Sequence, residues 1–152
     1  MTLLTDYILA MGSLLFALRL KATAGMQGQT CRKLWGLAFL SAATAAVLGG
    51  TYHGFSFYIE KTPHQALWNT TVYFIGLASG LMISGTLTSS LHRRDESVGW
   101  FLWGVGISLL GLGIQQSDIQ LHEHLNHNDL SHIILLGALY LFYRGSRLLQ
   151  DR

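Results

Sequence analysis

Five long apolar stretches dominate this sequence and leave little chain outside them. A helix that crosses a membrane needs about 20 mainly apolar residues, and five segments come close to or exceed that length: residues 3–20, 34–57, 67–91, 98–114 and 130–149. Only 12% of the 152 residues are charged, whereas soluble domains carry about 25%. The sequence therefore predicts an all-α integral membrane protein, with a single domain over residues 1–152 that contains five transmembrane helices.

Positive charges alternate along the segments that connect these stretches. The first and third connections and the C-terminal tail are rich in Lys and Arg, the second has Lys61 beside Glu60, and the fourth has none. Cytoplasmic loops carry the excess of Lys and Arg, so we expect the N-terminus outside and the C-terminus in the cytoplasm. No positive charge precedes the first stretch, which favours a retained helix over a cleaved signal. We expect the inner (plasma) membrane of a bacterium as the location.

Charge and cysteine content exclude several classes of protein. The net charge is +2, and the absence of a basic patch with interleaved aromatic residues argues against a nucleic-acid partner. Cys31 is the single cysteine, so an internal disulfide and a multi-cysteine zinc site are excluded. The expected partners are membrane lipids, and either other membrane subunits or further copies of this chain.

Small residues recur at helical spacing on three of the predicted helices. The stripes are Ala42, Ala46 and Gly50; Gly76, Gly80, Ser84 and Thr88; and Gly104, Ser108 and Gly111. Such stripes allow close approach of helices, so we expect each to face another helix. His53 follows Gly50 by three residues and Gln115 follows Gly111 by four, so both should point into the bundle.

Six of the seven histidines should gather at one end of the bundle, on its outer side. They are His53, His64, His122, His124, His127 and His132. Ionisable groups next to hydrocarbon are costly and mark candidate functional sites. His132 is prominent among them because it lies about one turn inside the last apolar stretch.

The start of the last helix adds polar residues to this group. His124, Asn128 and His132 are four residues apart and share a face wherever the chain is helical, and Asp129 lies close to that face. Asn128 or Asp129 could instead serve as the N-cap of this helix.

Imidazoles and a carboxylate at similar depth suit zinc and other first-row metals. We expect His53, His64, His124 and His132 as metal ligands, with Asn128, Thr51 and Gln115 supporting them. A zinc ion with an open coordination position makes hydroxide available near neutral pH. Asp129 is the candidate for proton transfer, although Asp129 or Glu123 could also bind or orient the metal.

The segments TYHGF and HNDLSH resemble the CREST superfamily of membrane hydrolases, which includes alkaline ceramidases and the adiponectin/progestin receptors. Members bind zinc through a His on the second helix and a His-xxx-His pair on the seventh, with an Asp and a Ser nearby. The resemblance implies that His53 and His132 are zinc ligands. The ending HNDLSHIILLGALYLFYRGSRLL is also similar to that of uncharacterised bacterial membrane proteins.

The chain departs from the CREST pattern at several positions. Asn128 stands where the first His of the pair would be, Gly49 stands in place of the serine, and His64 lies roughly where the Asp would be. Five helices replace seven. The resemblance therefore favours an altered metal site over ceramidase activity as such.

Three functions remain open from the sequence. The first is a zinc-dependent membrane hydrolase of a lipid amide or ester. The second is a b-type haem protein for electron transfer, with one haem between histidines of the second and fifth helices. The third is a non-catalytic accessory subunit of a larger membrane complex, in which the polar cluster joins helices or contacts a partner.

Overall fold

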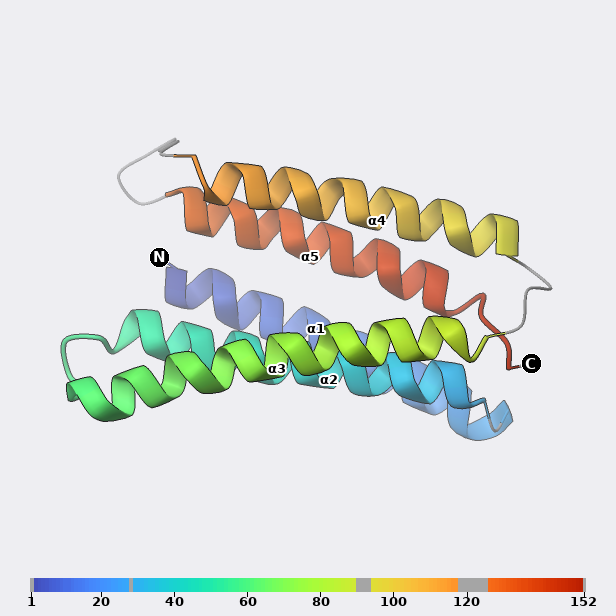
Figure 1. The fold of residues 1–152 in the computed structure, drawn as a ribbon, viewed down its shortest axis with the longest axis horizontal. Helices are drawn as coiled ribbons and strands as arrows, with labels where there is room; N and C mark the ends of the chain where they lie inside the picture. Colours follow the sequence, from blue (N-terminus) through green and yellow to red (C-terminus); the bar gives the residue numbers. More distant parts are fainter. Residues whose placement is uncertain (1, 28, 90–93, 118–125, 152) are drawn as a thin grey trace.

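The chain folds into an up-and-down bundle of helices (Figure 1). The computed structural model describes residues 2–27, 29–89, 94–117 and 126–151, and within these ranges each helix runs antiparallel to the one before it. The helices are α1 (Thr2–Gln27), α2 (Thr30–Gly54), α3 (Lys61–Leu87), α4 (Arg94–Gln115) and α5 (His127–Ser146). Each predicted apolar stretch falls largely within one helix, which confirms the all-α class.

Four of these helices are long and apolar enough to cross a membrane. The candidate spans are Thr2–Ala22, Thr30–Gly54, Lys61–Leu87 and Glu96–Gln115. Helix α5 has 20 residues and the length for a span, but it contains Asp129, His132 and Arg144 and is not among the four. By length and composition, the chain is a helical protein of the membrane class.

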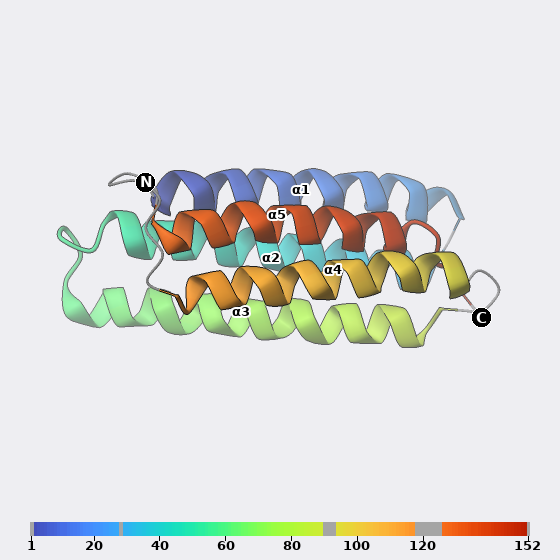
Figure 2. The ribbon, with the colours of Figure 1, turned by 90° about the horizontal axis from the view of Figure 1, so that it is seen from above.

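The helices form two groups (Figure 1), which meet where α1 lies beside α5 (Figure 2). Helices α1, α2 and α3 pack on one another in chain order, and α4 packs on α5. The main contact between the groups is that of α1 with α5, whereas α2 touches α5 only slightly. Along the described residues α3 and α4 make no extensive contact, so the two groups diverge on that side.

An aromatic cluster joins the two groups near the N-terminal half of α2. Trp35 of α2 stacks on Phe101 of α4 with ring centroids 5.1 Å apart, and Phe16 of α1 stacks on Tyr143 of α5 at 4.9 Å. Phe39 is fully buried and meets Phe16 edge-on at 5.6 Å. Such pairs add about 0.5–1.5 kcal/mol each beyond the burial of their area, so this half of the bundle is firmly packed.

Glycines in the stripes of α2 and α4 lie at helix contacts, as predicted. A Cβ atom at Gly50 would lie 2.9 Å from Cβ of Asp6 and 3.0 Å from the Tyr7 ring of α1. At Gly104 it would meet the Phe142 ring of α5 at 2.7 Å. The absent side chains therefore permit the close approach of α1 to α2 and of α4 to α5.

The prediction that the α3 stripe packs within the bundle is wrong. Gly76 and Gly80 are exposed, and a Cβ atom at either would have no neighbour within 4 Å among the described residues. Helix α3 instead buries Thr71, Ala78 and Gly85, which are spaced seven apart. Small residues occur on more than one face of this helix, so the spacing alone could not select the packed face.

The segment after α5 is held against the start of α2. The Asp151 carboxylate accepts hydrogen bonds from the backbone amides of Thr30 and Cys31, the latter at 2.7 Å, and Arg32 Nε donates to the Leu149 carbonyl at 3.0 Å. Burial alone would raise the pKa of Asp151, but these amide hydrogen bonds outweigh it and lower the pKa. The charged carboxylate complements the positive end of α2.

We predict that Gly50→Ala destabilises the bundle relative to Gly80→Ala. Both changes replace a helical glycine, but only the first adds a Cβ atom against the start of another side chain, Asp6. Overpacking of this kind costs about 1–3 kcal/mol, which should appear as the difference in unfolding free energy between the two variants in mixed micelles. Equal stabilities would contradict the close packing of α1 on α2.

Candidate functional site

Helix α5 begins in a capping box that buries Asp129. The N-cap is Asn126, whose side-chain oxygen accepts from the Asp129 amide at 3.0 Å, while the Asp129 carboxylate accepts from the Asn126 amide at 3.2 Å. Asp129 is completely buried. The prediction that Asn128 or Asp129 is the N-cap is wrong, because Asn126 has the extended backbone that an N-cap requires.

Threonines of α1 complete the surroundings of this cap. Thr5 Oγ1 donates to Asp129 Oδ1 at 3.1 Å, and the Asn126 side-chain amide donates to Thr2 Oγ1 at 3.4 Å. Both oxygens of the buried Asp129 carboxylate therefore have donors, from α5 and from α1. Asp129 holds the first turn of α5 against α1 and is not among the residues that line the neighbouring cavity.

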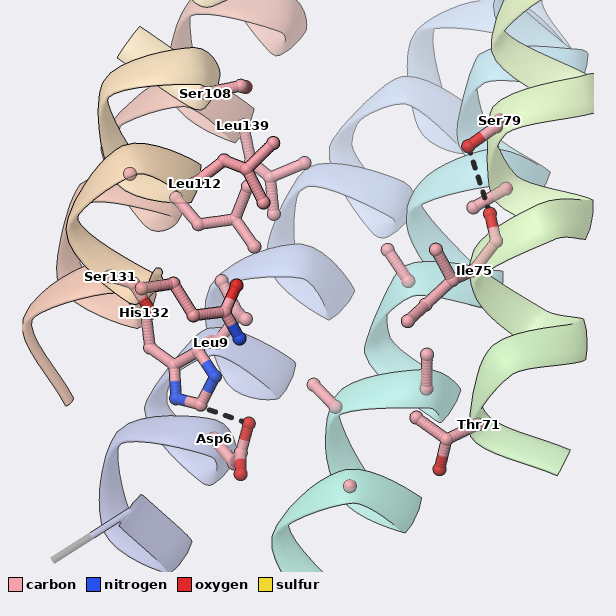
Figure 3. A pocket seen from close by; sticks show the side chains of 18 of the residues that line it. Asp6, Leu9, Thr71, Ile75, Ser79, Ser108, Leu112, Ser131, His132 and Leu139 are labelled. Carbon is pink, nitrogen blue, oxygen red and sulfur yellow. Dashed lines mark hydrogen bonds and ion pairs between the residues drawn. The ribbon is translucent and has the colours of Figure 1, made fainter. Parts of the chain in front are cut away.

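One turn further along α5, His132 faces a second carboxylate, that of Asp6. His132 Nδ1 lies 3.4 Å from Asp6 Oδ1 and 3.3 Å from Thr5 Oγ1, and Figure 3 shows the His132 and Asp6 side chains meeting between α5 and α1. Asp6 is 4% exposed, and its Oδ2 has no hydrogen-bond partner among the described residues. A buried carboxylate oxygen of this kind is available to a cation or to a polar ligand.

Sequence reasoning missed Asp6, although a signal was present. It is the one acidic residue in the predicted first span, residues 3–20. An ionisable residue inside a membrane segment marks a functional site by default. The predicted site was instead based on the histidines near the connections between helices.

Asp6 and His132 lie at one end of a cavity of about 420 Å³ between the two groups of helices (Figure 3). Residues from every described helix line it. The polar ones are Asp6, His53, Thr71, Ser79, Ser108, Gln115, Ser131 and His132. Much of the remaining wall is apolar, and it includes Phe142, whose ring lies near that of Phe101. The cavity therefore combines an acid–imidazole end with a hydrocarbon-lined body.

The structure brings three of the predicted side chains to this cavity. His53 and Gln115 line it, as the small-residue stripes of their helices predicted, and His132 does so from α5. His53 also contacts the Tyr52 ring edge-on, with centroids 5.1 Å apart.

The other predicted side chains are placed elsewhere. The His64 ring stacks on Tyr52 at 3.9 Å and lies 3.1 Å through Nε2 from the Tyr52 carbonyl oxygen. Thr51 donates to the Val47 carbonyl at 2.8 Å, and Asn128 accepts from Ser131 through its carbonyl at 2.8 Å. His64, Thr51 and Asn128 are not among the residues that line the cavity. The prediction for His124 lies outside the described residues.

Within the part of the chain that the structure describes, no three His, Cys, Asp or Glu side chains form a group that could hold a metal ion. His53 and His132 share the cavity, but the described side chains do not close around a common centre. The four-histidine zinc site stays a prediction, and Asp6 is the carboxylate that the cavity itself offers.

Fold and site together define a helical membrane protein with a histidine- and aspartate-bearing cavity between its helices. Residues 1–94 and 88–151 match a family of unknown function (DUF6962). The chain belongs to this family. No curated protein and no solved structure matches it.

We predict that Thr5→Val weakens the junction of α1 with α5. Valine has nearly the same shape but cannot donate to the buried Asp129 carboxylate, and an unsatisfied buried group costs about 1–3 kcal/mol. Thr70→Val is the matched control, because Thr70 is exposed and, among the described residues, bonds only to the Ala66 carbonyl of its own helix. Unfolding in mixed micelles should be easier for the Thr5 variant alone, and equal effects would contradict this role of Thr5.

Proposed function

We propose that this protein is an integral membrane hydrolase that binds a lipid amide or ester in the cavity and uses a zinc ion near His53, His132 and Asp6. The proposal rests on the presence of two imidazoles and a carboxylate on the wall of one cavity whose body is largely apolar. A cavity of about 420 Å³ falls in the size range of small-molecule sites. The amide or ester class comes from the resemblance to the CREST hydrolases.

Two features of the cavity favour a cation, although no three ligand side chains of the described residues surround one position. Asp6 Oδ2 is buried and has no partner among the described residues, and buried polar atoms normally have one. His132 Nδ1 is directed at Asp6 and Thr5, which leaves Nε2 for an ion, in the manner of the carboxylate–histidine pairs of zinc sites. Asp6 would then act as the group that orients His132.

The same residues would have different roles in hydrolysis. Zinc, when bound, polarises a carbonyl and provides hydroxide near neutral pH. Asp6 would hold His132 in the required tautomer, and the apolar walls would take the acyl chain and keep bulk water out. The lipid would enter between α3 and α4, which make no extensive contact along their described residues.

The distribution of Lys and Arg supports an orientation for this site. With the N-terminus outside and α5 as a fifth span, Asp6, His53 and His132 lie at the outer end of the bundle. A substrate in the outer leaflet would then reach the cavity without crossing the membrane.

A second candidate function is that of an accessory subunit, and the α3 surface favours it. Gly76 and Gly80 are exposed with open space beside them, and exposed glycines at this spacing allow another helix to approach closely. In that case the polar cluster would join helices and bind no metal.

We predict about one zinc ion per chain in protein purified in detergent and dialysed extensively, since catalytic zinc is held by several protein ligands. His53→Ala and His132→Ala should each remove it, because both imidazoles face the cavity. Elemental mass spectrometry measures the content. His64→Ala is the matched control, because its ring lies against Tyr52 outside the cavity lining.

The other outcomes separate the alternatives. Zinc that is lost equally in the His64 variant would contradict the cavity as its site. Iron with a haem absorption spectrum would favour the electron-transfer protein, and a folded protein without bound metal would favour the accessory subunit.

A further inference from the structure

The end of the bundle opposite His53 has a second cleft, formed by the first turns of α4 and the last turns of α5. It has a volume of about 490 Å³ and is lined by Glu96, Trp100, Arg144, Arg147 and Leu148. The C-terminus of α5 and the start of α4 lie together at this end in Figure 1. None of these residues lines the cavity of the proposed hydrolase site.

The two arginines of the cleft are positioned by aromatic rings. The Arg144 guanidinium lies over the Trp100 ring, 4.6 Å from its centroid, and Nη1 donates to the Tyr140 hydroxyl at 3.2 Å. The Arg147 guanidinium lies 5.7 Å from the centroid of Tyr143. Contacts of this kind restrict the side chains before a ligand binds, which lowers the entropy cost of binding.

The tail contacts also fix the position of this cleft. Leu148 lies between Arg147 and Leu149, and the Leu149 carbonyl accepts from Arg32 of α2. Arg144 lies in the last turn of α5, and Arg147 is its C-cap residue with a helical backbone. Because they are three residues apart, they project from the same side of the helix. Both are exposed, and no ion pair to either is present among the described residues.

We propose that this cleft binds the phosphate of an anionic phospholipid in the cytoplasmic leaflet. Guanidinium groups recognise phosphate oxygens through paired hydrogen bonds. Tryptophan is typical of the headgroup level of a membrane, so Trp100 places the arginines at the depth of lipid phosphates. Two arginines and Glu96 leave the cleft with one net positive charge, which complements a phosphodiester. Basic pockets between membrane helices on this side are suited to anionic headgroups.

The test uses the full chain purified in detergent, with lipid adducts counted by native mass spectrometry. Phosphatidylglycerol should bind more tightly than phosphatidylcholine, and glycerol phosphate should bind far more weakly than either lipid. Arg144→Gln with Arg147→Gln should weaken phosphatidylglycerol binding roughly 30-fold, from about 1 kcal/mol for each basic residue at a membrane surface. Lys21→Gln with Lys33→Gln removes equal charge from the same end of the bundle without changing a residue that lines the cleft, and it should change binding by no more than about two-fold.

Glu96→Gln should strengthen lipid binding, whereas a loss of folding would weaken it. Removal of this carboxylate should strengthen phosphatidylglycerol binding by about five-fold, because a negative charge beside the phosphate disappears. The proposal is overturned if phosphatidylcholine binds as well as phosphatidylglycerol, or if the lysine variant loses as much binding as the arginine variant. Glycerol phosphate that binds as tightly as the lipid would overturn the membrane as the source of the phosphate.

Discussion

A buried polar junction between α1 and α5 determines how the two groups of helices meet. Carboxylates inside an apolar bundle are costly unless they are paired or hydrogen-bonded. Asp129 is satisfied by Thr5 and by the cap at Asn126, and Asp6 is paired through one oxygen with His132. The groups meet mainly through α1 and α5, so this junction, together with the aromatic cluster, sets the width of the cavity between them.

The same arrangement leaves α3 and α4 dependent on their surroundings. Only 17% of the most apolar stretch of each of these two helices is buried within the protein, whereas 56% of the corresponding stretch of α2 is buried. Their exposed faces suit contact with lipid, and residues of both helices line the cavity. A polar end and a largely apolar body are the features that a site for an amphipathic substrate needs. An accessory subunit would use the exposed α3 face for a partner helix instead.

The sequence was sufficient to predict the helices and part of the cavity, because hydrophobic length and small-residue spacing are local signals. The stripe that ends in Gly50 placed His53 toward the bundle, and the depth of His132 in its apolar stretch marked it as unusual. Both residues line the cavity.

The remaining features depend on contacts between distant segments. Asp6 is part of the site because it contacts His132 of α5, which lies more than a hundred residues away in the chain. His64 stacks on Tyr52, and the sequence around neither residue indicates this contact. Helix α3 has small residues on two faces, and only the placement of α2 decides between Gly76 and Ala78 as the packed position.

We propose that Asp6 and His132 act on one bound ion as a unit. Its most direct test is the affinity for Zn²⁺, measured by isothermal titration, in the native chain, Asp6→Asn, His132→Ala and the double variant. Loss of a partner that orients a zinc ligand weakens binding by about 10- to 100-fold. Each single change should weaken binding at least this much, and the double change should cost little more than His132→Ala alone. Independent, multiplicative losses, or an affinity that neither change affects, would contradict it.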